Sequence, residues 1–449
     1  MHALQLDLLH LGTAKTESYR LKAVKSSGIW SHHLGERPAP YGEYRWVVES
    51  AETGRCIASR GFSPLFWEWT TTSEAERGGT KALYEVFRIP FPKIASRFLI
   101  QRRRVGNVFE DVFETSLSQI SENLSKIIFP ESLKEDVVEI MRNGSDINKL
   151  NILVLGDGYT TSEKKKFIED SRTFKKLLFS VSPYKERMQD FNVLSLFTPS
   201  QESGITDPSK GIYRHTVFES SYNSLGIDRY LLPRNVRAVY EYSSRVPWDT
   251  QVILCNSDKF GGGGLYGKFS CFASRSKKIK YLAIHEFAHS FAGLADEYYT
   301  APVTYESRTN SYMDPWEPNI SRLDERGDVK WSSLIDASTP VPTPWGKKTY
   351  EGLMKKYEEL REIALIENGD LSQEISRVAI EAKQYLENQA YFEKIGAFEG
   401  AQYKSRGLYR PGTTCVMFNR ETDHFCQVCQ NAISSTIDIA IRRKSVQSR

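Results

Sequence analysis

Hydrophobic and polar positions change rhythm twice along the chain. Up to about residue 115, short runs rich in β-branched and aromatic residues are separated by Gly, Pro and Ser turns. Such runs are typical of the strands of an antiparallel β-sandwich. The runs are MHALQLDLLHLG, YRLKAV, YRWVVES, CIASRGF, ALYEVFRI and SRFLIQRRRV.

Around residues 116–145 the pattern becomes helical, in SLSQISENLSKII and SLKEDVVEIMRN on either side of Pro130. From residue 150, LNILVLGDGYTTSEKKKFIEDSRTFKKLLF predicts a buried strand, a Gly turn and an amphipathic helix. DFNVLSLFTPS and WDTQVILCNS predict two more strands, and a long polar helical stretch follows residue 345. Alternating strands and helices indicate an α/β domain.

The length of 449 residues exceeds what one hydrophobic core usually holds, so we expect a multidomain α+β protein. The patterns place an N-terminal antiparallel β-sandwich domain at residues 1–120 and a helical linker at 121–149. A catalytic α/β domain is expected at residues 150–449.

Charge and composition exclude two classes of partner. The net charge of +4 is small, and the basic runs at 101–104 and 274–280 are typical of a solvated strand end or helix start. We therefore expect no nucleic-acid partner. No apolar run approaches the roughly 20 residues of a transmembrane helix. The N-terminus lacks a basic start and a cleavage site, so no signal segment is visible in this chain.

Residues 284–299, IHEFAHSFAGLADEYY, place two histidines and several carboxylates among apolar side chains. On a helix, positions four apart share a face, so His285 and His289 can bind one ion. This HExxH pattern is typical of Zn²⁺, which lowers the pKa of a bound water to about 7, with Glu286 as its general base. A pair of surface histidines is the alternative, and the apolar flanks disfavour it.

A third zinc ligand is expected after the helix. Gly293 is suited to end the helix in a left-handed conformation, and Asp296 follows three residues later. The metzincin pattern HExxHxxGxxH has the same gap between its glycine and its third ligand. This chain has one extra residue before the glycine and Asp in place of His. Asp296 is favoured, and Glu297 is the alternative.

The stretch IHEFAHSFAGLADEYY resembles the active site of the IgA-peptidase family of bacterial zinc metalloproteases, a metzincin-like group. Other segments resemble the same family, and the N-terminal GFSPLFWEWTTTSEA is similar to its preceding β domain. These segments are NILVLGDGYTTSE, FNVLSLFTPSQESGITDP, KFGGGGLYGKFS, GAFEGAQYKSRGLYRP and CVMFNRETDHFCQVCQNAI. The resemblance implies that His285 and His289 are zinc ligands and Glu286 the base. It also implies Asp296 as the third ligand.

The resemblance also implies a methionine turn at Met417, which would form an apolar floor under the ligand histidines. An ordinary core methionine is the alternative. Some metzincins carry a tyrosine two residues later that stabilises the oxyanion, but this chain has Asn419. Tyr298, Tyr299 and Asn419 are the candidate oxyanion donors.

Two loops have open interpretations. Residues 261–274 are rich in glycine, and Tyr266 to Ala273 could form an edge strand that binds a peptide, or the glycines a flexible loop. Residues 200–207 carry Glu202 and Asp207, which suit a surface loop near the cleft or a structural Ca²⁺ or Zn²⁺ site.

Six cysteines are too few for a disulfide scaffold at this length. Cys426 and Cys429, with His424 and Cys415, could bind a structural zinc. A disulfide that includes Cys415, or free core thiols, is the favoured interpretation.

Together these features predict a secreted or surface zinc endopeptidase of extracellular, periplasmic or cell-surface location, acting on protein or peptide substrates. One alternative is a binding protein whose N-terminal domain contacts a glycan or host protein, with a zinc domain of minor activity. The intact Glu286 argues against it. Another alternative is a zinc hydrolase of non-peptide amides. The resemblance implies no particular substrate, since immunoglobulin is cleaved by some family members only.

Overall fold

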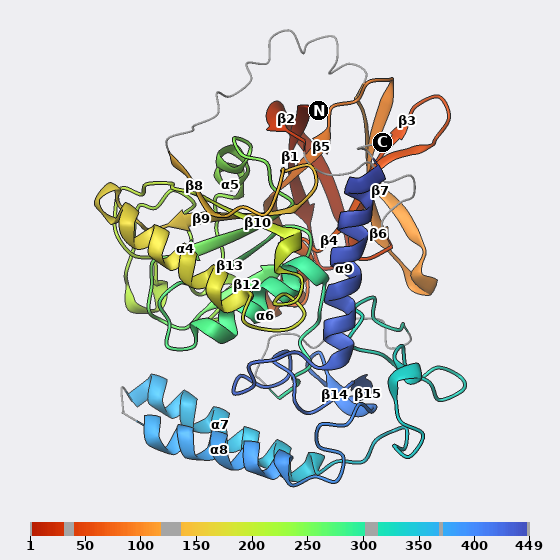
Figure 1. Ribbon diagram of the computed structural model, residues 1–449, viewed down its shortest axis with the longest axis vertical. Helices are drawn as coiled ribbons and strands as arrows, with labels where there is room; N and C mark the ends of the chain where they lie inside the picture. Colours follow the sequence, from red (N-terminus) through yellow and green to blue (C-terminus); the bar gives the residue numbers. More distant parts are fainter. Residues whose placement is uncertain (1, 31–39, 118–135, 301–312, 368–370, 447–449) are drawn as a thin grey trace. The chain divides into compact units, whose positions relative to one another are not determined.

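The computed structural model describes residues 2–30, 40–117, 136–300, 313–367 and 371–446. The chain forms two compact units, the first of residues 1–293 and 433–449 and the second of residues 294–432. Figure 1 follows the chain from its N-terminal strands to its C-terminal helix.

The N-terminal part of the first unit contains two antiparallel sheets, with strand orders β2-β1-β5 and β4-β3-β6-β7. The six strand-like runs of the sequence all lie on strands, and β7 is an addition. The strands are β1 (His2–Gly12), β2 (Glu17–Ile29), β3 (Tyr44–Ser50), β4 (Cys56–Phe62), β5 (Lys81–Pro90), β6 (Ser96–Arg103) and β7 (Phe109–Ser116). Two short helices, α1 (Leu65–Trp69) and α2 (Ser73–Glu76), separate β4 from β5.

The two sheets share one hydrophobic cluster. On β1, alternate residues Leu4, Leu6 and Leu8 join it, as the two-residue period of a strand requires. Phe98 of β6 and Val48 of β3 enter the same cluster from the other sheet. Burial of apolar area at about 25 cal/mol per Å² is the main force that holds such sheets together.

The rest of the first unit is built on a six-stranded sheet of order β12-β13-β11-β9-β10-β8. The four inner strands are parallel, and β8 and β12 pair antiparallel at the two edges. The strands are β8 (Val137–Met141), β9 (Leu150–Asp157), β10 (Phe191–Leu196), β11 (Thr250–Cys255), β12 (Gly262–Leu265) and β13 (Phe269–Ala273). Helix α4 (Lys164–Leu178) connects β9 to β10, α5 (Val236–Ser243) lies between β10 and β11, and α6 (Ile279–Ala292) follows β13. The predicted strands at 150, 191 and 250 are confirmed.

One correction concerns the helical linker expected at residues 121–149. Residues 118–135 lie outside the described residues, but Val137–Met141 form strand β8, which pairs with β10. The β-branched pair Val137 and Val138 suits a half-buried strand, and the open edge of the sheet supplies the partner. The central sheet therefore begins before residue 150.

The N-terminal sheets and the six-stranded sheet are joined inside the first unit by a buried ion pair. Lys268 Nζ lies 2.8 Å from Glu85, and both side chains are about 5% exposed. The ammonium also lies 4.0 Å from the ring centroid of Phe87. Because a buried charge without its partner costs several kcal/mol, this contact holds β5 against the turn after β12. The domain limits at residues 120 and 150 stay a prediction.

The second unit contains the hairpin β14 (Phe398–Ala401) and β15 (Lys404–Arg410) and the helices α7 (Lys347–Glu367) and α8 (Ser372–Glu387). The two helices confirm the polar helical stretch predicted after residue 345. Helix α9 (Gln427–Val446) starts in this unit. Within the described ranges, no helix combines the length and apolarity needed to cross a bilayer.

Candidate metal centre and active site

Helix α6 carries the HExxH residues and is buried on nearly every side. Phe287 packs edge-on against Phe174 and Tyr184 and stacks on Phe291, with ring centroids 5.2 Å apart in the last pair. The helix also contacts β12 and β13. A helix that is apolar all round is a core element, so its polar side chains are held in fixed positions.

His285 and His289 point at one another from successive turns of α6. Their Nε2 atoms are 3.1 Å apart, and the His285 ring stacks on Tyr281 at 4.6 Å between centroids. Two imidazole nitrogens at 2.0–2.1 Å from a tetrahedral zinc would be about 3.3 Å apart. The donor pair therefore fits one zinc ion without rearrangement.

Glu286 lies on the side of α6 that faces the edge strand β12. A Cβ built on Gly262 would come within 2.9 Å of Glu286 Oε1. The carboxylate is nearly buried, at 9% exposed. Its position beside the two imidazoles suits a base that takes a proton from a water held near them.

The glycine run has a steric explanation. A Cβ on Gly264 would meet the Glu286 carbonyl oxygen at 2.3 Å and His289 Cβ at 2.8 Å. Only glycine lets β12 approach α6 this closely. The edge strand is thus Gly262–Leu265, and not 266–273 as expected, because Gly267 turns the chain at φ 70° and β13 pairs inside the sheet.

Gly264→Ala should destabilise the protein by roughly 1–3 kcal/mol, because the added methyl overpacks the contact between β12 and α6. Thermal unfolding would measure the change. Gly352→Ala on α7 is the control, since a Cβ there meets nothing within 4 Å. Equal unfolding temperatures for the two variants would contradict the close approach.

Gly293 ends α6 in the left-handed conformation that the sequence predicted, at φ 65° and ψ 32°. Its N–H bonds back to the carbonyls of Ala288 and His289. The chain then enters the second unit, where Asp296 lies three residues further.

Asp296 is held by the tip of the β14–β15 hairpin. Its Oδ2 accepts a hydrogen bond from the Tyr403 hydroxyl, and its carbonyl accepts one from Gln402 N at 3.0 Å. Gln402 and Tyr403 both have positive φ, 46° and 60°. Such a two-residue turn matches strand twist but strains residues other than glycine. Sequence reasoning missed Tyr403, because 107 residues separate it from Asp296.

Glu297 is engaged elsewhere in the second unit. It is fully buried, and its N–H donates to the Met417 carbonyl at 2.9 Å. Its Oε1 accepts from Asn319 Nδ2 at 3.0 Å and from Cys429 Sγ at 3.1 Å. Burial raises the pKa of Glu297 well above its usual value. Asp296 and Glu297 thus have separate partners, as neighbours on an extended segment should.

Met417 is fully buried in a tight turn, in which Phe418 N bonds to the Cys415 carbonyl at 2.9 Å. Of the candidate oxyanion donors, Tyr299 is buried in the second unit against Arg410 and Trp345. The Tyr298 hydroxyl lies 3.2 Å from the Tyr403 hydroxyl, whose own hydrogen is donated to Asp296.

Asn419 and the residues 200–207 have partners of their own. The Asn419 side-chain oxygen accepts from Glu421 N at 2.9 Å. Asp207 pairs with Lys259 at 2.9 Å, and Glu202 accepts from His215 N at 2.6 Å. Both carboxylates therefore have protein partners that stabilise the loop.

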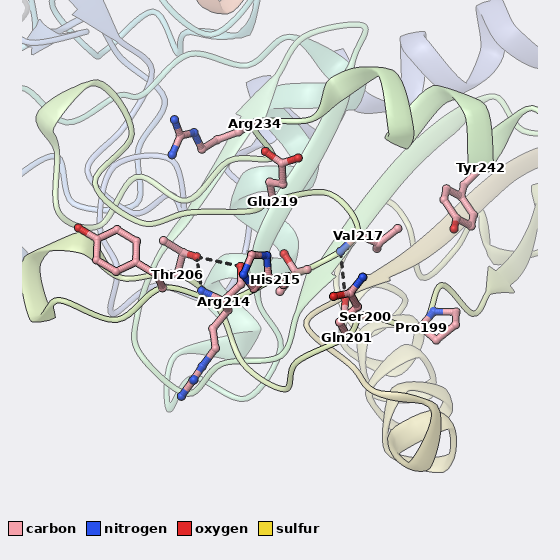
Figure 2. A pocket seen from close by; sticks show the side chains of 12 residues that line it. Pro199, Ser200, Gln201, Thr206, Arg214, His215, Val217, Glu219, Arg234 and Tyr242 are labelled. Carbon is pink, nitrogen blue, oxygen red and sulfur yellow. Dashed lines mark hydrogen bonds between the residues drawn. The ribbon is translucent and has the colours of Figure 1, made fainter.

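A separate cavity of about 470 Å³ opens beside this loop (Figure 2). Asp157, at the end of β9, orders its wall by accepting from Phe218 N at 3.2 Å and Ser220 N at 2.9 Å. The lining residues are Pro199, Ser200, Gln201, Thr206, Tyr213, Arg214, His215, Thr216, Val217, Glu219, Arg234 and Tyr242. Ligands of open α/β sheets bind at such carboxyl ends of strands.

Comparison with protein families gives two matches that together span most of the chain. Residues 138–437 match the family described as IgA Peptidase M64, and residues 1–114 match Peptidase M64 N-terminus. Comparison with curated proteins finds no match. The family is one of metallopeptidases, which implies a metal and a protein substrate. The chain therefore belongs to the IgA peptidase M64 family, as the HExxH stretch and the order of the other segments predicted.

Proposed function

We propose that the protein is a zinc-dependent endopeptidase. His285 and His289 are two of the ligands, Glu286 is the general base and Asp296 is the third ligand. The observation that carries this proposal is the pair of Nε2 atoms 3.1 Å apart, beside a nearly buried carboxylate on one rigid helix.

Asp296 is supported by the covalent chain itself. Three peptide units reach at most about 11 Å, so Asp296 lies within that distance of Gly293 at the end of α6. The Tyr403 hydroxyl bonds to the Asp296 carboxylate, and the Gln402 N–H bonds to the Asp296 carbonyl. These two hydrogen bonds orient the carboxylate. We propose Met417 as the methionine turn of the same site.

Zinc held by His285, His289 and Asp296 would supply Lewis acidity, which would polarise a peptide carbonyl and make water acidic near neutral pH. Glu286 accepts the proton of the attacking water and delivers it to the leaving amine. The close contact with Gly262 limits the space in which the carboxylate can move. Tyr298 and Asn419 are the remaining candidates for the oxyanion donor, since Tyr299 is buried against Arg410 and Trp345.

The edge strand β12 supports a peptide substrate over a small amide. Gly262 exchanges backbone hydrogen bonds outward, donating to Arg229 O at 3.1 Å and accepting from Leu231 N at 3.4 Å. By the two-residue period of a strand, the backbone of Gly264 faces the same way as that of Gly262. An extended substrate can add to this edge, two residues further along.

The two N-terminal sheets with their shared core are proposed to form a β-sandwich, with an extracellular or surface location for the whole protein. The alternative of a binding protein with a weakly active zinc domain gains no support, since His285, Glu286 and His289 are all present.

A peptide-library cleavage profile with metal removal tests the function. Wild-type protein should cleave peptides, lose this activity after dialysis against a chelator, and recover it when zinc is added back. Cleavage that persists after metal removal would contradict a zinc peptidase.

Tyr403→Phe should lower kcat/KM and zinc affinity by about 10–100-fold, as expected when a partner of a ligand is lost. The phenyl ring keeps the packing while Asp296 loses a donor. Tyr409→Phe, in the same hairpin, is the matched control. If both variants keep wild-type activity and zinc affinity, Tyr403 does not position the ligand.

A further inference from the structure

A second group of ligand atoms lies entirely within the second unit. The carboxylate of Glu297 and the thiols of Cys415, Cys426 and Cys429 all lie within 4.8 Å of one another. The Glu297 carboxylate contacts Cys429 Sγ at 3.1 Å, and Cys415 Sγ lies 3.7 Å from Cys429 Sγ. Glu297, Cys415 and Cys429 are fully buried.

The sulfur atoms are spaced as metal ligands and not as a disulfide. A bonded pair would be separated by about 2.05 Å. Two thiolates at about 2.3 Å from a tetrahedral zinc would be about 3.8 Å apart. The observed 3.7 Å between Cys415 and Cys429 matches the second value.

The carboxylate of Glu297 gives an independent indication of a cation. Its Oε2 has no hydrogen-bond partner among the described residues, although the side chain is fully buried. A buried polar atom of this kind costs free energy unless something pairs with it. The other buried thiol pair, Cys255 and Cys271 at 3.4 Å, belongs to no such metal-capable group among the described residues.

We propose that Glu297, Cys415, Cys426 and Cys429 bind a structural Zn²⁺, distinct from the ion at the HExxH motif. Three thiolates select a soft or borderline metal, and four protein ligands close the coordination shell. His424, which the sequence suggested as one of the ligands beside Cys415, Cys426 and Cys429, has a side chain that is 58% exposed, and Glu297 takes its place.

The proposed ion joins three segments that bear on the active site. Cys415 precedes Met417, Cys426 and Cys429 mark the start of α9, and Glu297 directly follows Asp296 in the chain. The bond from Glu297 N to the Met417 carbonyl already links two of them. The second ion would therefore fix the backbone that presents Asp296.

Zinc content of the full chain, purified under reductant, tests the proposal. Wild type should hold two zinc ions per chain, and His285→Ala/His289→Ala should keep one. Cys426→Ser/Cys429→Ser should lose one, whereas the control Cys56→Ser should keep two. Cobalt(II) added to the metal-free histidine variant should give a thiolate-to-cobalt charge-transfer absorption, a readout that needs no folded cysteine variant.

Absence of this absorption, or unchanged zinc content in the cysteine variant, would overturn the proposal. So would a disulfide between any two of Cys415, Cys426 and Cys429, identified by peptide mapping of the chain prepared without reductant. The histidine variant separates the two sites, because it lacks the HExxH ligands and keeps the cysteines. If this variant shows no thiolate-to-cobalt absorption, the second site is refuted and the proposed peptidase function is not affected.

Discussion

Glu286→Gln should lower kcat about 10²–10⁴-fold while zinc content stays at the wild-type value. The amide has nearly the size of the carboxylate, so it fits the narrow space against Gly262. It cannot accept a proton from the attacking water, and this step is where the general base contributes. Steady-state peptide cleavage and metal analysis on one preparation would measure both quantities.

The control is Glu374→Gln, an exposed position on α8, which should cleave at the wild-type rate. A Glu286→Gln variant that retains full turnover would refute the role of this residue as base. A variant that is inactive and also lacks zinc would instead make Glu286 part of the metal site.

His285→Ala/His289→Ala should remove one equivalent of zinc and abolish detectable cleavage. The remaining carboxylate cannot hold the ion alone, because two of the three expected protein ligands are gone. Zinc that binds only the folded state stabilises it by about 2.7 kcal/mol at 100 times Kd. Added zinc should therefore raise the unfolding temperature of metal-free wild type more than that of the double variant.

His424→Ala is the matched control, since this side chain is exposed and should not change zinc content. Full retention of both cleavage and zinc in the histidine variant would refute the assignment of the metal site.

The sequence by itself determined the elements whose signals are local. Alternation on β1 predicts a strand, because successive side chains of a strand point to opposite faces. The apolar run at residues 152–155 in β9 predicts a strand that is buried on both faces. The spacing of four between His285 and His289 predicts a shared helix face, and the structure places their Nε2 atoms 3.1 Å apart. Gly293 ends that helix as expected, because a left-handed cap needs no partner elsewhere in the chain.

Only the tertiary structure decided the features that depend on distant partners. The sequence pattern predicted a helix at residues 137–141, but these residues form a strand that pairs with β10. The edge of the sheet supplies their hydrogen-bond partners, and the local pattern contains no information about that edge. Tyr403 meets Asp296 across 107 residues, and Cys429 meets Glu297 across 132. No local period encodes such contacts, since they arise from how the elements pack. The fourth member of the cysteine cluster is for this reason Glu297, a residue that the sequence placed beside the catalytic zinc.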